Sequence, residues 1–102
     1  MKRDSIRLSY EYIAYIKKLA KDIFSADEIK IFGSRIDRKR KGGDIDIFIK
    51  TPIDSNLLDL KIKFLWKFKK KFGLQKIDLI IKTPNSVEKK IFKIAEEEGI
   101  KI

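Results

Sequence analysis

Two apolar segments, separated by a short polar loop, restrict this chain to a sheet of short strands. The first covers residues 28–32 and ends at Gly33-Ser34. The second, residues 44–50, alternates strictly: an isoleucine follows each of Asp44, Asp46 and Phe48. This alternation is typical of a strand with two different faces. Because side chains at i and i+2 project from the same face of a strand, Asp44 and Asp46 are expected to lie together.

The residue types in this stretch point to phosphate and metal chemistry. The small residues Gly33 and Ser34 allow backbone N–H groups and a hydroxyl to approach a phosphate closely. Two neighbouring carboxylates repel each other unless a divalent cation lies between them. We therefore expect a phosphoryl- or nucleotidyl-transfer site here.

The composition narrows the kind of metal and partner. The 102 residues include no histidine and no cysteine, so a metal would be held by oxygen atoms, which favours Mg²⁺ or Mn²⁺. The net charge of +10 favours an anionic partner, although a general bias toward Lys and Ile is an equal explanation. The lack of cysteine fits a cytoplasmic location. No secretory signal or membrane-spanning run is recognisable.

Apolar periodicity and helix-terminating residues predict a single α+β domain over residues 1–102, with a small mixed sheet covered by helices. Asp54 or Ser55 is expected to cap the second helix and Gly73 to end it. Asn85, with Glu88 three residues later, resembles the capping box of a last helix that ends near Gly99. The expected order is α-β-β-α-β-α plus a short final strand, over residues 5–24, 28–32, 44–50, 54–72, 76–82, 85–99 and 100–102.

A third acidic residue, Asp78, lies within the otherwise apolar strand expected at residues 76–82. An isolated buried carboxylate is costly, so Asp78 should lie at an open strand end or beside a charged partner. If this strand is next to residues 44–50, Asp78 can join Asp44 and Asp46. Three carboxylates on adjacent strands would form a site for two cations.

The combination of Gly33-Ser34-Arg35, Gly43-Asp44-Ile45-Asp46 and the later Asp78 resembles the signature of the DNA polymerase β-type nucleotidyltransferase superfamily. Within it, the chain is similar to the minimal nucleotidyltransferases over nearly its whole length. Two positions depart from the pattern: residues 36–39 lack a further glycine, and Gly43 replaces a serine that many relatives have before the first aspartate.

The resemblance implies a role for each matching residue. Gly33 and Ser34, with Arg35 and Gly43, would bind the nucleoside triphosphate, and Asp44, Asp46 and Asp78 would be catalytic and hold two Mg²⁺ ions (or Mn²⁺). Asp78 would also help to activate the acceptor hydroxyl. Arg35 has an equal alternative role, which is to pair with Asp37 or a site carboxylate.

The function implied by the resemblance is transfer of AMP from ATP to an acceptor hydroxyl. The expected acceptor is a tyrosine of a helical HEPN-type toxin, which would make this chain the antitoxin of a toxin–antitoxin pair. Two alternatives are a non-catalytic module that neutralises its partner by complex formation, and nucleotide transfer to RNA.

Three surface features leave open questions. The basic run Arg38–Lys41 is either a solvated loop tip or an attractor for triphosphate or RNA. Trp66 and Ile62 fall at the edge of the second helix's apolar face, where they are either exposed anchors for a partner or buried. The tyrosines of the first helix, Tyr10, Tyr12 and Tyr15, are expected in the core and at its boundary, not as a stacking platform for bases.

Overall fold

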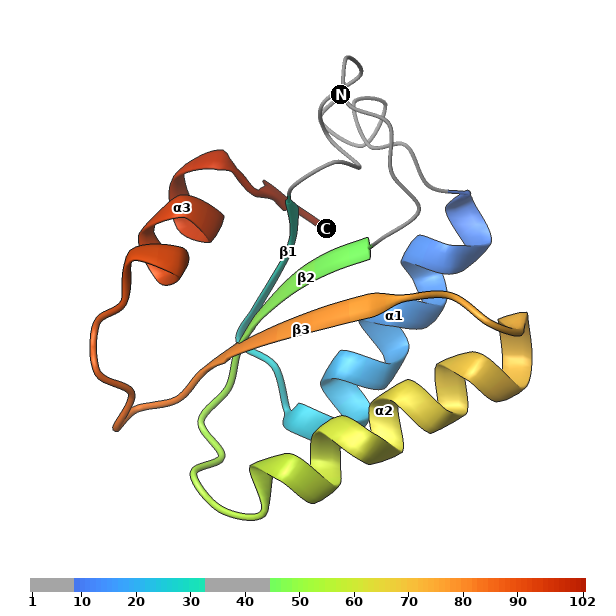
Figure 1. Cartoon of the computed structure of the whole chain (residues 1–102), viewed down its shortest axis with the longest axis horizontal. Coiled ribbons are helices and arrows are strands. Elements are labelled where there is room, and N and C mark those ends of the chain that lie inside the picture. Colours follow the sequence, from blue (N-terminus) through green and yellow to red (C-terminus); the bar gives the residue numbers. More distant parts are fainter. Residues whose placement is uncertain (1–8, 33–44) are drawn as a thin grey trace.

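The computed structural model describes residues 9–32 and 45–102. In this part of the chain, three helices lie around one four-stranded sheet (Figure 1). The elements are α1 (Tyr10–Phe24), β1 (Glu28–Phe32), β2 (Ile45–Lys50), α2 (Leu57–Phe72), β3 (Ile77–Lys82), α3 (Lys90–Glu98) and β4 (Ile100–Lys101). The predicted α+β class and element order are confirmed.

The sheet is mixed, with strand order β3-β2-β1-β4. β1 pairs antiparallel with β2 and with β4, whereas β2 and β3 run parallel. A parallel pair requires a crossover connection, and α2 provides it. The register of β2 and β3 matches Ile45 with Ile77, Asp46 with Asp78 and Lys50 with Lys82.

Helices cover both faces of this sheet (Figure 1). The larger core lies between the sheet and helices α1 and α2, where Ile45, Ile47 and Ile49 of β2 pack against buried residues such as Phe64 and Phe68. The smaller core lies under α3 and joins Phe48 of β2 to Phe32, Phe92 and Ala95. β2 is therefore buried on both faces along most of its length, and Asp46 shares the α3 face with Phe48.

The first helix begins later than expected. Ser9 is its N-cap, with an extended backbone and a side chain that accepts a hydrogen bond from the Tyr12 N–H at 3.2 Å. A start near Ser5 is therefore wrong, because the serine hydroxyl satisfies a backbone donor that has no partner inside the helix. The apolar positions predicted for this helix are all buried, namely Ile13, Ile16, Ala20, Ile23 and Phe24.

The expected N-terminal caps of the other two helices are also wrong. The N-cap of α2 is Asn56, in the left-handed region at φ 57°, because the Asp54 carboxylate accepts a hydrogen bond from Asn85 instead. α3 begins at Lys90, not at Asn85. Ser86 closes a turn by accepting from the Thr83 N–H at 2.9 Å.

The helix ends and strands agree closely with the sequence expectations. Gly73 follows α2 at φ +82°, a conformation that side chains rarely adopt, and Gly99 follows α3. β1 has the predicted bounds, β3 is shorter by one residue, and Asp44 lies outside the described residues. No helix in ranges 9–32 and 45–102 is both long and apolar enough to cross a bilayer.

Candidate active site

Two of the three predicted carboxylates are brought together by the parallel strands. Asp46 on β2 and Asp78 on β3 are Cα partners in the ladder, so their side chains project from the same face. Adjacent strands lie about 4.8 Å apart, which is close enough for both carboxylates to share one cation. Asp46 is half-buried and Asp78 is exposed, so solvent reaches the pair. The condition for Asp78 to join Asp46, that its strand lies next to the second strand, is therefore met.

The segment that carries the remaining predicted site residues connects to this end of the sheet. Phe32, the last residue of β1, is the antiparallel partner of Asp46. In the sequence Gly33 follows Phe32 directly, and Asp44 precedes Ile45, the first residue of β2. Gly33, Ser34, Arg35, Gly43 and Asp44 themselves lie outside the described residues, as does the basic run 38–41.

The opposite end of the same strands is basic. Lys50 and Lys82 are ladder partners four residues beyond Asp46 and Asp78, and they lie on the same face. At about 3.3 Å per residue, the two pairs are separated by roughly 13 Å. This face therefore carries an acidic end and a basic end, with Phe48 and Ile80 between them.

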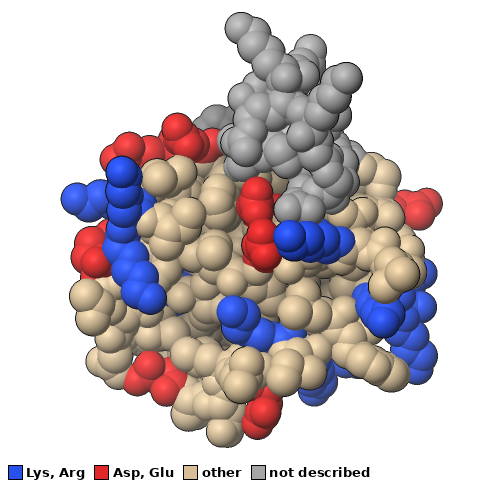
Figure 2. Space-filling model, viewed as in Figure 1, with Lys and Arg blue, Asp and Glu red and all other residues tan. Residues whose placement is uncertain are grey.

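Lys82 is engaged by carboxylates near α3, not by the aspartate pair. Its Nζ donates to Glu96 at 2.8 Å and lies 3.5 Å from Glu88. Figure 2 shows acidic and basic side chains side by side in the region of α3. The hydrogen bond to Glu96 raises the pKa of Lys82, and the same bond lowers the pKa of Glu96 below its usual range. These ion pairs fasten α3 to the sheet. They involve Lys82, at the end of β3 opposite to Asp78.

The strand that carries Asp46 is held firmly. Phe48 is fully buried and lies 6.4 Å from Phe92 of α3, ring centre to ring centre. Beyond the strand end, Thr51 is buried and donates its hydroxyl hydrogen bond to the carbonyl oxygen of Phe24. Burial on both faces and this tie to α1 fix the position of β2, and with it the position of Asp46.

The aspartate pair has the donor type that Mg²⁺ and Mn²⁺ prefer, namely carboxylate oxygen in a solvent-accessible place. Asp78 makes no hydrogen bond or ion pair with any residue that the structure describes. In ranges 9–32 and 45–102 no three acidic residues are grouped closely enough for a metal ion. The third predicted ligand, Asp44, lies outside those ranges, so the described part of the chain supplies a two-carboxylate partial site.

The basic end of this face was not anticipated from the sequence. The signal was present, since Asp46, Phe48 and Lys50 follow the same period of two, as do Asp78, Ile80 and Lys82. The partner Glu96 was harder to foresee, because it lies on a helix whose start depends on the turn at residues 83–86.

Searches of protein-family models and of curated protein sequences found no match to this chain.

Proposed function

We propose that this chain is a metal-dependent nucleotidyltransferase of the minimal type. The observation that carries the proposal is the alignment of Asp46 with Asp78 on one face, at the end of the sheet where β1 leads to Gly33-Ser34 and β2 follows Asp44. The residue types fit a triphosphate and divalent cations: small residues and backbone N–H groups for the phosphates, carboxylates for the metal.

The residues of the site have two roles, metal binding and triphosphate binding. Asp46, Asp78 and Asp44 hold Mg²⁺, and Gly33, Ser34, Arg35 and Gly43 bind the triphosphate. The bound cations supply neutralisation of the charge that develops on the attacking and leaving oxygens. Asp46 is held on a strand buried on both faces, and such a rigid ligand positions the α-phosphate for in-line attack.

The reaction transfers a nucleoside monophosphate. The oxygen of an acceptor hydroxyl forms a bond to the α-phosphorus of ATP, while the bond from that phosphorus to the bridging oxygen of the β-phosphate breaks. Pyrophosphate leaves with the electron pair of the broken bond. Asp78 is solvent-exposed and acts near the acceptor, where its carboxylate receives the hydroxyl proton directly or through water.

The acceptor follows from the family resemblance: a tyrosine hydroxyl of a helical HEPN-type protein, whose toxicity the modification would silence. The chain then acts as an antitoxin by covalent modification.

Binding is tested by thermal denaturation with Mg²⁺ and ATP, since a ligand bound only to the native state raises the melting temperature. We expect a rise for the wild type and none for Asp46→Asn or Asp78→Asn. Asp27→Asn is the matched control, because Asp27 is exposed and precedes β1 at the other end of the sheet. Equal rises in all four proteins would refute a nucleotide site at the aspartate pair.

Catalysis is tested with ATP labelled at the α-phosphate, Mg²⁺ and the product of the neighbouring gene. The proposal requires label on a tyrosine of that protein, and loss of label with Asp46→Asn and Asp78→Asn. Suppression of toxicity by the double variant, without label, would instead establish the complex-forming alternative. Label in RNA would establish the RNA acceptor.

A further inference from the structure

A groove lined by lysines runs between α1 and α2, on the side of the sheet opposite to the aspartate pair. We call it the α1–α2 groove and define it by four residues of α1 (Glu11, Ala14, Tyr15 and Lys18) and four of α2 (Trp66, Lys67, Lys70 and Lys71). The part of it between Tyr15 and the α2 residues has a volume of about 340 Å³, which is in the range of small-ligand sites at ~300–1,000 Å³. Since α1 and α2 pack on the sheet face of Ile45 and Ile47, the groove and Asp46 lie on opposite faces.

The positive charge of this groove is largely uncompensated. Lys67, Lys70 and Lys71 form no ion pair with any residue in the described part of the chain. Lys18 pairs with Asp22 at 3.1 Å, but both side chains are more than half exposed, so this pair is weak. Glu11 is the one acidic residue among the described residues that line the groove. Such a concentration of free cations attracts a polyanion.

Aromatic rings lie among these lysines. Trp66 is 60% exposed, although burying an indole would be favourable, and Lys70 Nζ lies 5.1 Å from its ring centre. Lys71 Nζ lies 5.1 Å from the ring centre of Tyr15. A flat apolar ring beside ammonium groups can stack a base while the lysines contact the neighbouring phosphates.

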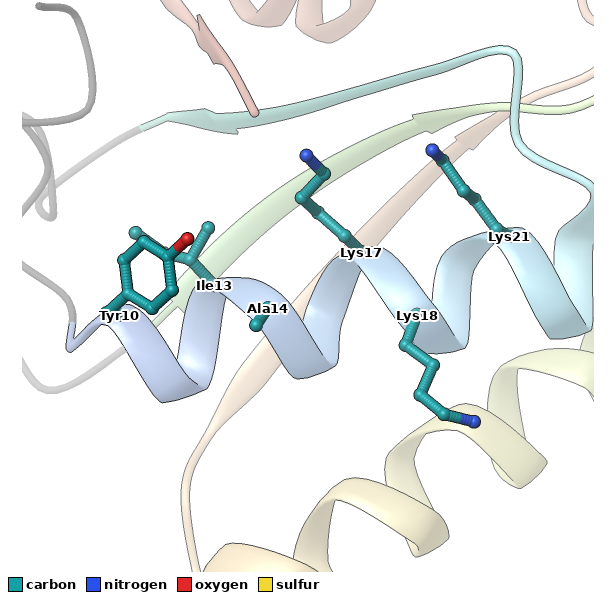
Figure 3. Close-up of a pocket in the computed structure, with 6 residues that line it drawn as sticks. All are labelled: Tyr10, Ile13, Ala14, Lys17, Lys18 and Lys21. Atoms are coloured by element: carbon teal, nitrogen blue, oxygen red, sulfur yellow. The ribbon is translucent and has the colours of Figure 1, made fainter.

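The basic surface continues over the outer side of α1. A second depression there shares Ala14 and Lys18 with the groove and adds Tyr10, Lys17 and Lys21. Figure 3 shows Lys17 and Lys21 projecting together from one side of α1, while Lys18 points toward α2. Tyr10 is 70% exposed, contrary to its expected place in the core or at its boundary. Because they share lining residues, the two depressions are neighbours on the surface of α1.

We propose that the α1–α2 groove binds single-stranded nucleic acid, with phosphates along the lysines and a base stacked on Trp66. The chemistry requires only a polyanionic backbone and an accessible base, so RNA and DNA are both ligands. Binding is expected to be strongly dependent on salt and weakly dependent on sequence.

An acidic protein helix would complement the positive charge of the groove, but its aliphatic anchors would not match the apolar side chains that line it. Helix-in-groove recognition uses aliphatic and aromatic anchors at i, i+3, i+4 and i+7. The exposed aliphatic side chains of α2, Leu58 and Ile62, do not line either depression. The exposed large apolar side chains that do line them are both aromatic, Tyr10 and Trp66. Aromatic faces among lysines favour bases over a helix.

Trp66 gives a direct test, because it is the only tryptophan of the chain. The protein is titrated with a twelve-nucleotide oligoribonucleotide and with its DNA counterpart, and Trp66 fluorescence is recorded. We expect quenching on binding, since a stacked base contacts the indole. The affinity should fall with salt, with a slope of about −0.7 for each phosphate neutralised.

Matched variants locate the binding, measured by the anisotropy of a labelled oligonucleotide. Lys67→Gln with Lys70→Gln should weaken binding roughly tenfold near 0.1 M salt and make the salt slope shallower by about 1.4. Trp66→Leu should weaken it by roughly 5- to 100-fold. Lys90→Gln with Lys93→Gln removes the same charge from exposed positions of α3 and should change affinity less than threefold. Circular dichroism confirms that each variant is folded.

The proposal does not depend on nucleotidyltransferase activity, so the Asp46→Asn, Asp78→Asn double variant should bind the oligonucleotide like the wild type. It is overturned if the groove variants bind as tightly as the wild type, or if Arg38→Gln with Lys39→Gln alone abolishes binding. Quenching of Trp66 by inorganic polyphosphate to the same degree would overturn the base-stacking part. Binding of an acidic amphipathic peptide in place of the oligonucleotide would overturn it altogether.

Discussion

Asp46 and Asp78 occupy matched positions of two parallel strands, so two carboxylates face the same side at one end of the sheet. Like charges on directly neighbouring strands are unfavourable. Replacing either aspartate with asparagine would keep the shape of the side chain and remove one of the two like charges. The arrangement is typical of sites that sacrifice some stability for a ligand.

The first prediction concerns the loss of stability caused by the two neighbouring carboxylates. In the absence of divalent metal, Asp78→Asn should increase the free energy of unfolding by about 0.2–1 kcal/mol, because it removes a like charge from the ladder position beside Asp46. The gain should shrink as salt is added, since ions screen exposed charges. Denaturant unfolding with and without Mg²⁺ provides the measurement. Asp27→Asn, the control at the other end of the sheet, should show no such gain, and a loss of stability in Asp78→Asn would count against the repulsion.

The second prediction concerns pH and the ion pairs that fasten α3 to the sheet. Because Lys82 lowers the pKa of Glu96, the pair stabilises the fold above the usual glutamate pKa of about 4.3 and loses this effect as pH falls through the lowered pKa of Glu96. On the alkaline side, the raised pKa of Lys82 keeps the effect below about pH 10.4, and the effect is lost at higher pH as Lys82 deprotonates.

The variant Lys82→Met separates this pair from other titrating groups, because it keeps an unbranched apolar side chain but removes the ammonium group, which lies 5.7 Å from the ring centre of Phe92. Its melting temperature should be lower than that of the wild type at pH 6, and the difference should narrow toward pH 3. Lys93→Met, an exposed substitution on the same helix, should run parallel to the wild type throughout. A difference that is constant between pH 6 and pH 3 would contradict the role of Glu96.

Much of the fold could be predicted from periodicity, and the errors share one cause. The bounds of β1, the C-terminal glycines and the neighbouring positions of Asp46 and Asp78 followed from spacing and alternation. The helix starts did not, because short polar side chains such as Ser86 and Asp54 can cap a helix or close a turn. Tertiary contacts decide between these uses: Asp54 binds Asn85, and Glu88 faces Lys82.

The aspartate pair could be predicted from the sequence, whereas the exposure of Trp66 could not. A period of two places Asp46, Phe48 and Lys50 on one face, so the acidic end was accessible from the sequence. The exposure of Trp66 was not, since its place on a helical wheel at the edge of the apolar face fits either burial or exposure. The position of α1 decides this, because Tyr12 and Tyr15 fill the space against Phe68 and Phe72 and leave the indole outside.

The third prediction concerns the junction between α3 and β4. A Cβ atom at Gly99 would lie 2.3 Å from the carbonyl oxygen of Ala95 and 3.0 Å from Cβ of Lys30. The first contact is with backbone and cannot be relieved by rotating a side chain. Gly99→Ala should therefore destabilise the fold by about 1–3 kcal/mol, by overpacking. Glu98→Ala, at an exposed neighbouring position, should stay within about 0.5 kcal/mol of the wild type in urea denaturation.

The last prediction concerns Thr51, the polar side chain among the described residues that is buried where β2 ends. Its hydroxyl donates to the Phe24 carbonyl and accepts from the Ile53 N–H at 3.0 Å, so it links the end of α1 to the segment that leads into α2. Thr51→Val keeps the volume but leaves both backbone groups without this partner, which should cost about 1–3 kcal/mol. Thr51→Ser keeps the hydroxyl and loses one methyl group, for which about 0.8 kcal/mol is expected. Denaturant unfolding of the two variants measures the difference, and a valine variant as stable as the serine variant would mean that water or another donor replaces the hydroxyl.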